Sequence, residues 1–251
     1  MHESDRLFRP DDFPAALALL SRWPLRIPER ALARGARTAW SWPLVGLALA
    51  GLAALTAWIA QILGIPEEIS ALLALTTLVV LTGALHEDGL ADTADGFWGG
   101  FETTRRLEIM RDSRIGSYGV LALVLSLLLR GAGLIALSDH LFAALVVPAA
   151  TSRAAMAYVM DTLPGVRPDG LSHTTGLPGA DALRAALLIA AVIALLFAGW
   201  AGIWAIVAAA AACVLVANLA LAKVGGQTGD VLGATQQITE IAALLALTAT
   251  L

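Results

Sequence analysis

The sequence predicts an all-α, polytopic membrane protein with about seven transmembrane helices, with six as the alternative. Hydrophobic residues make up 58% of the 251 residues and charged residues only 14%, whereas soluble domains average about 45–50% and 25%. The mean hydropathy is +0.77. Several apolar runs reach the roughly 20 residues that a helix needs to cross the hydrocarbon layer. These segments must be helical, because a lone extended backbone cannot satisfy its hydrogen bonds in lipid.

Seven candidate spans follow from the apolar runs. We place them at residues 42–63, 69–85, 116–137, 141–160, 182–199, 201–222 and 231–251. The break near Gly199 is very short, so the fifth and sixth spans form either a hairpin or a partly re-entrant pair. Residues 1–41 are expected to be a cytoplasmic or interfacial segment, and residues 42–251 an integral membrane catalytic domain. Within the first part, residues 11–23 fit either a short interfacial helix or an ordinary segment before the membrane.

The basic residues predict the orientation. Seven arginines precede the first span, and 14 of the 16 Lys and Arg residues fall on one side of a seven-span topology. Positive loops stay in the cytoplasm, so the N-terminus is predicted to be cytoplasmic and the protein to be a multi-pass protein of the bacterial inner membrane.

Cys213 is the only cysteine and lies in an apolar run. A disulfide within the chain or a metal site built from cysteines is therefore excluded. No cleavable signal peptide is expected, because the first 40 residues are polar and rich in arginine.

A cluster of aspartates follows the second span directly. If that helix continues, Asp88, Asp92 and Asp95 lie within an arc of about 60° on one face. Such a stripe repels itself unless a cation compensates for it, and oxygen ligands without cysteine favour Mg²⁺, with Mn²⁺ as a possible substitute. The alternative is a solvated helix face. The neighbouring residues are small and apolar, whereas a solvated face would carry Lys or Glu, so this alternative is disfavoured.

Further polar residues are predicted on the same side of the membrane. Asp112 offers a fourth metal ligand or a general base, and His86 is either an alternative base or a hydrogen-bonded helix residue. The long loop 161–181 exceeds an ordinary connection. The residues expected to bind a phosphate-bearing substrate are Arg105, Arg106, Arg111, Ser113, Arg114, Arg153, Thr228 and Asp230. For the arginines the alternative is membrane anchoring, and for Thr228 or Asp230 it is capping of the last helix.

Charges inside the spans require partners. We expect Glu240 to pair with Arg153, and Arg130 either to pair with Asp139 or to extend toward the membrane surface.

Two motifs and a turn resemble the cobalamin synthase family, the adenosylcobinamide-GDP ribazoletransferases. They are His-Glu-Asp-Gly-Leu-Ala-Asp-Thr-Ala-Asp-Gly at 86–96, Glu-Ile-Met-Arg-Asp-Ser-Arg-Ile-Gly-Ser-Tyr-Gly at 108–119 and Thr-Gly-Asp-Val-Leu-Gly-Ala at 228–234. The resemblance covers nearly the whole chain. Glu87 stands where the family pattern leads us to expect an apolar residue, so we do not count it as a ligand.

The resemblance implies a Mg²⁺-dependent transferase. A hydroxyl of α-ribazole or its 5′-phosphate would attack the cobinamide-bound phosphorus of adenosylcobinamide-GDP and release GMP. The expected partners are these substrates and membrane lipid, without nucleic acid and with a homo-oligomer as an option.

Two other functions fit part of the pattern. A CDP-alcohol phosphotransferase also carries spaced aspartates and glycines, but Ala91-Asp92 stands where an arginine is expected soon after its first Asp-Gly. A transporter would use intramembrane charges such as Arg153 and Glu240 to line a pathway.

Overall fold

The computed structural model describes residues 7–167, 170 and 174–251. Within this part every regular element is a helix, apart from an isolated parallel bridge between Gly165 and Gln227. Before the first long helix come α1 (Asp12–Leu20), α2 (Glu29–Leu32) and η2 (Gly35–Ser41). The helix expected in residues 11–23 is confirmed as α1, which packs on α3 and η2, and its interfacial position stays a prediction.

The predicted apolar spans are confirmed as helices, with ends that differ by a few residues. They correspond to α3 (Trp42–Ile62), α4 (Glu67–Thr82), α7 (Ser117–Ala136), α8 (Leu141–Thr162), α10 (Ala180–Val224) and α11 (Gly229–Thr248), with η3 (Ser138–His140) between α7 and α8. Five helices in the described chain are long and apolar enough to cross a membrane, or six if the bent pair α4 and α5 (Leu85–Gly99) is one span. The polytopic helical class is confirmed.

The helix α10 contains both the fifth and the sixth predicted spans. Gly199 has a non-helical backbone, with φ 52° and ψ −126°. A Cβ on Gly202 would collide with the carbonyl of Ala194, although residues eight apart in a straight helix are about 12 Å apart. The chain therefore reverses at Gly199, and the tight break predicted there is a hairpin of two helical arms.

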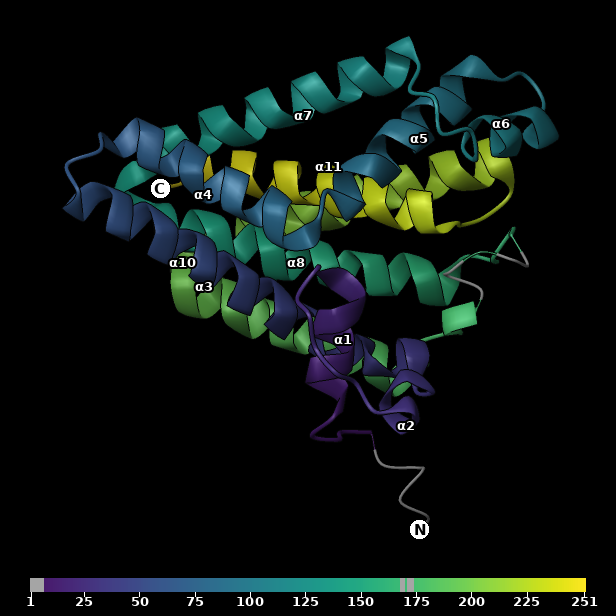
Figure 1. Cartoon of the computed structure of the whole chain (residues 1–251), viewed down its shortest axis with the longest axis horizontal. Coiled ribbons are helices and arrows are strands. Elements are labelled where there is room, and N and C mark those ends of the chain that lie inside the picture. The colour runs from purple at the N-terminus through teal and green to yellow at the C-terminus, as the bar shows by residue number, and fades with distance from the viewer. Residues whose placement is uncertain (1–6, 168–169, 171–173) are drawn as a thin grey trace.

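The sequence suggested that the second span continues straight into the aspartate cluster. The structure shows a bend between them instead. Gly83 and Ala84 both adopt a left-handed backbone, with φ 64° and 57°, and α5 leaves α4 at 83°. These two residues separate α4 from α5, which is a new helix with a different axis. In Figure 1, α5 and α6 (Thr103–Ile109) lie at one end of the bundle, and the C-terminus lies at the other.

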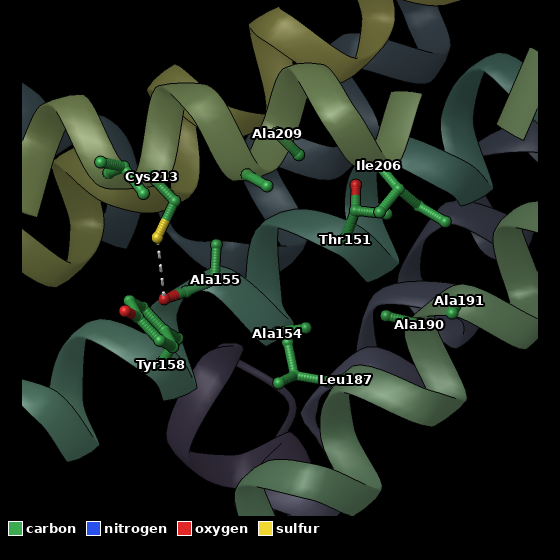
Figure 2. Close-up of a pocket in the computed structure, with 12 residues that line it drawn as sticks. Thr151, Ala154, Ala155, Tyr158, Leu187, Ala190, Ala191, Ile206, Ala209 and Cys213 are labelled. Carbon is green, nitrogen blue, oxygen red and sulfur yellow. Dashed lines mark hydrogen bonds between the residues drawn. The ribbon is translucent and has the colours of Figure 1, made fainter. Parts of the chain in front are cut away.

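The helices pack closely through small residues. Gly46 of α3 faces α8 so tightly that a Cβ would collide with the carbonyl of Ala149. Looser packing leaves a cavity of about 260 Å³ between α8 and the two arms of α10. Figure 2 shows its almost wholly apolar lining, in which the Cys213 thiol lies 3.8 Å from the carbonyl oxygen of Ala155.

A buried polar network joins α5, α7, α8 and α11. Arg130 of α7 pairs with Glu87 of α5 at 2.7 Å and with Glu240 of α11 at 2.9 Å. Gln237 bonds to Glu87 and Arg130, and Gln236 bonds to Glu240 and to Ser152 of α8.

The network corrects both predictions about intramembrane charges. Glu240 pairs with Arg130 rather than Arg153, and Arg130 neither pairs with Asp139 nor extends to the surface. Arg153 instead donates to the carbonyl of Ala149. The reason is the direction in which each side chain leaves its helix, which depth along a span does not determine. Glu87, unexpected from the family pattern, is explained as the partner of Arg130.

Candidate functional site

The site is built where α5 crosses the start of α11. Gly89 and Gly233 meet there: a Cβ on Gly89 would lie 2.8 Å from the carbonyl oxygen of Asp230 and 3.1 Å from the Cα of Gly233. Only glycine allows two backbones this close without displacement. The crossing therefore brings the aspartate face of α5 beside the first turn of α11.

Three carboxylates share this region. Asp88 and Asp92 lie one helical turn apart on α5, as their spacing predicted. The charge of Asp92 interacts with those of Asp230 and Asp88, and also with the guanidinium of Arg167. Arg167 donates to the Asp230 carboxylate at 2.6 Å and to the carbonyl of Leu107 at 3.1 Å. The site thus gathers three carboxyl groups around one firmly held guanidinium.

Asp95 has a different environment from the other two aspartates of α5. Its carboxylate accepts hydrogen bonds from the backbone N–H of Gly116 at 2.6 Å and of Gly119 at 2.9 Å. These donors begin α7, whose N-terminal N–H groups have no partner within the helix. A Cβ on Gly116 or Gly119 would collide with this carboxylate. Asp95 therefore holds α7 against α5.

The structure describes no group of three or more His, Cys, Asp and Glu side chains arranged to hold a metal ion within the ranges given above. The metal set of Asp88, Asp92, Asp95 and Asp112 stays a prediction. Mg²⁺ often binds one or two carboxylates and completes its shell with substrate phosphates and water. Asp88 and Asp92, one turn apart beside Asp230, fit that kind of donor set.

Asp112 and Arg114 form an exposed pair between α6 and α7, joined at 2.6 Å. Hydrogen bonds from the side chain and then the backbone of Arg114 lower the pKa of Asp112 to about 2. A carboxylate this acidic is a weak proton acceptor near neutral pH. Asp112 is thus better suited to be an anionic ligand than a general base.

The remaining residues of this segment differ in what they contact. Arg106 donates to the carbonyls of Gly100 and Lys223, so it fastens α6 to the end of α10. Arg105 pairs with Glu108 at 3.0 Å on the surface. Arg111 and Ser113 are exposed. Their predicted substrate contacts stay predictions.

Thr228 and Asp230 begin α11. The Thr228 hydroxyl accepts from the N–H of Val231 at 3.2 Å, so the predicted capping role is confirmed for Thr228. Asp230 instead receives Arg167, which places it in the site. Of the long predicted loop, residues 168–169 and 171–173 lie outside the described residues.

A cavity of about 210 Å³ opens beside the carboxylates. The residues that line it include His86, Asp88, Arg167 and Asp230. The side chain of His86 is only 2% exposed, and its Nε2 has no hydrogen-bond partner in the described part of the chain. Arg153 is not among the residues that line this cavity.

Arg167 and Gly233 are site residues that sequence reasoning did not select. Arg167 stands in the polar loop 161–181. The length of this loop indicated a function for the loop as a whole, but nothing in the sequence distinguished this side chain. Gly233 stands in the 228–234 motif, which indicated no role for this residue by itself. Its role follows only from the crossing with Gly89.

The fold and this cavity define a polytopic helical membrane protein with a carboxylate- and arginine-containing site at one end of its bundle. The family model for cobalamin-5-phosphate synthase matches residues 12–248, nearly the whole chain. The chain belongs to this family, and it is accordingly a transferase.

Curated relatives agree with the family match. A protein of Azorhizobium caulinodans is 50% identical over 93% of this chain and 94% of its own length. Relatives from Bradyrhizobium diazoefficiens and Sinorhizobium medicae are 45% and 41% identical, over 84% and 94% of this chain and 82% and 95% of their own lengths. All three are named adenosylcobinamide-GDP ribazoletransferase. No solved structure was found that matches this chain.

Proposed function

We propose that this protein is an adenosylcobinamide-GDP ribazoletransferase. It joins α-ribazole or its 5′-phosphate to adenosylcobinamide-GDP, releases GMP and forms adenosylcobalamin or its 5′-phosphate. The observation that carries the proposal is the family match over residues 12–248, which includes every element of the site. The paired carboxylates of α5 beside Arg167 agree with it, because a diphosphate needs both a bound cation and arginine donors.

The reaction exchanges one bond at phosphorus for another. A hydroxyl oxygen of the ribazole forms a bond to the cobinamide-side phosphorus, while the bond from that phosphorus to the oxygen of GMP breaks. The hydroxyl proton passes to a base, and GMP leaves as an anion. The protein must hold the diphosphate, stabilise the departing charge and accept one proton.

Mg²⁺ is the cofactor we propose, with Mn²⁺ as a substitute. Asp88 and Asp92 would hold the ion, and Asp230 lies close enough to interact with the charge of Asp92. A divalent ion held by these residues would neutralise the charge that develops on the leaving group. Arg167 keeps Asp230 in place through its 2.6 Å contact and adds positive charge beside the carboxylates.

His86 is the proposed proton acceptor. It lines the cavity, and its Nε2 has no hydrogen-bond partner in the described part of the chain, so this nitrogen has a free lone pair or N–H for the substrate. Asp112 is less suited to this step, since its pKa is about 2.

We place the active site on the cytoplasmic side of the bacterial inner membrane. The support is the charge asymmetry of the sequence, in which the loops on the side of α5 and α6 contain the basic residues.

The test is to identify the nucleotide that purified protein releases. Adenosylcobinamide-GDP with α-ribazole should yield GMP and a cobalamin product in the presence of Mg²⁺. Release of CMP from a CDP-alcohol in place of this reaction would indicate a CDP-alcohol phosphotransferase. Solute flux into liposomes without nucleotide turnover would indicate a transporter.

A further inference from the structure

We infer that the cavity between α1, α3, α5, α8 and α11 is the binding site for the aromatic base of the ribazole, and that Leu19 and Trp42 help to select this base. The inference rests on the proposed function and deepens it. It assigns one part of one substrate to a defined place in the protein.

The cavity has two unlike walls. The polar wall contains Asp88 of α5 and Asp230 of α11. The apolar wall consists of side chains from other elements: Leu19 and Leu20 of α1, Trp42 of α3, and Met156 and Met160 of α8. A nucleoside with an apolar base and a polar ribose fits such a cavity in one direction, with its ribose hydroxyls toward the carboxylates and the base toward the apolar wall.

The apolar wall is suited to a flat aromatic ring. Methionine side chains adapt to irregular shapes and make favourable sulfur–aromatic contacts. Aromatic rings add stacking or edge-to-face contacts to the burial of apolar area. The base of ribazole is a benzimidazole with two methyl groups, so most of its surface is apolar.

Two residues that line the cavity have a buried polar atom without a hydrogen-bond partner. Trp42 is 2% exposed, yet its indole Nε1 has no hydrogen-bond partner in the described part of the chain. The same is true of the His86 Nε2. A buried polar group without a partner is costly, and a ligand can supply the missing bond. The indole is a donor, and benzimidazole linked to ribose retains one acceptor nitrogen.

The other substrate groups fit this cavity poorly. A volume of about 210 Å³ lies below the ~300–1,000 Å³ of pockets for drug-sized ligands, and a corrin ring is larger than such ligands. Guanine carries several donors and acceptors, which the apolar wall of leucines and methionines cannot satisfy. The single-acceptor base of the ribazole is the group whose size and polarity match.

The experiment compares Michaelis constants for the two substrates in membranes or detergent. Leu19 is half-buried at the cavity edge, so Leu19→Trp should fill the space and raise the KM for α-ribazole about tenfold. The KM for adenosylcobinamide-GDP should not change. A riboside of benzimidazole without the methyl groups leaves room for the new tryptophan, so Leu19→Trp should bind it with a KM close to that of wild type.

Trp42→Phe removes the indole N–H. It should raise the KM for α-ribazole about fivefold, which corresponds to the cost of one hydrogen bond.

The matched control is Leu187→Trp. Leu187 lines the other cavity, between α8 and α10, and the same substitution there should leave both Michaelis constants unchanged. Thermal unfolding of each variant identifies those that fail to fold.

The substrate series tests the wild-type protein. Each methyl group removed from the base should raise the KM for the riboside by about fourfold, which corresponds to the transfer free energy of one buried carbon.

Three results would overturn the inference. One is a wild-type KM for the riboside that does not depend on the methyl groups. The second is a folded Leu19→Trp protein that discriminates between the two bases as wild type does. The third is a raised KM for adenosylcobinamide-GDP in place of that for α-ribazole. Failure of the proposed function looks different, because wild-type protein would then release no GMP with any riboside.

Discussion

At the scale of single residues, the three aspartates of α5 have distinct surroundings despite their regular spacing. Asp88 and Asp92 face the start of α11, where the charge of Asp92 interacts with Asp230. Asp95 has both oxygens occupied by backbone donors of α7. The predicted metal role is therefore best supported for the first two residues.

Asp95→Asn tests this distinction. The amide replaces one accepting oxygen with a donor that faces backbone N–H groups, so we expect a loss of about 1–2 kcal/mol in the free energy of unfolding, as for other lost helix caps. Turnover of the protein that remains folded should fall less than in Asp88→Asn or Asp92→Asn. Thermal unfolding and GMP release measure the two effects. A stable Asp95→Asn protein without turnover would show that Asp95 binds the metal after all.

Sequence reasoning identified residue types more reliably than their contacts. It selected Asp88 and Asp92 because a stripe of carboxylates needs a compensating cation, and Asp230 because it begins the last helix, where it would bind substrate or cap the helix. It could not separate Asp95 from them, because the partners of Asp95 are backbone groups more than 20 residues further along the chain. It paired Glu240 with Arg153 by depth alone, whereas the observed partner, Arg130, is on α7.

At the scale of secondary-structure elements, two features place α5. The left-handed residues Gly83 and Ala84 turn it away from α4 by 83°, and the crossing of Gly89 with Gly233 sets it against α11. The sequence predicted helix bounds well, because apolar runs and polar loops alternate clearly. It did not predict the bend, since Ala84 is an ordinary helix-forming residue whose positive φ follows from tertiary packing.

Gly89→Ala should separate α5 from α11. The new Cβ would lie 2.8 Å from the carbonyl oxygen of Asp230, and this backbone atom cannot move without shifting α11. We expect lower thermal stability, by an amount equivalent to about 1–3 kcal/mol, together with a clear loss of turnover. The control is Gly51→Ala in α3, where a Cβ would meet nothing within 4 Å. If both variants behave like wild type, the close crossing does not position the site.

At the scale of the whole molecule, the polar network around Arg130 connects the helices beneath the site. Arg130, Glu87 and Glu240 come from α7, α5 and α11, and all three are buried. Burying such charges is favourable only when each has a partner. Because Glu87 stands beside His86 and Asp88, the network also fixes the base of the helix that carries the site.

Arg130→Met should destabilise the folded protein strongly. It leaves two buried carboxylates without their cation, a change that costs about 3–5 kcal/mol in comparable buried pairs. The measurement is thermal unfolding in detergent, with Arg184→Met as the control. Arg184 and Asp181 form an exposed pair, so its loss should change the free energy of unfolding by less than about 1 kcal/mol. Equal unfolding temperatures for the two variants would mean that the network does not stabilise the bundle.

The central claim is that Asp88 and Asp92 form the Mg²⁺-dependent transfer site for adenosylcobinamide-GDP. It is tested most directly by GMP release from adenosylcobinamide-GDP and α-ribazole, measured against Mg²⁺ concentration for wild type, Asp88→Asn and Asp92→Asn. We predict Mg²⁺-dependent release by wild type, and a loss of at least about 100-fold, or a much higher Mg²⁺ requirement, in each folded variant. Full GMP release by either variant at the same Mg²⁺ concentration would contradict the account.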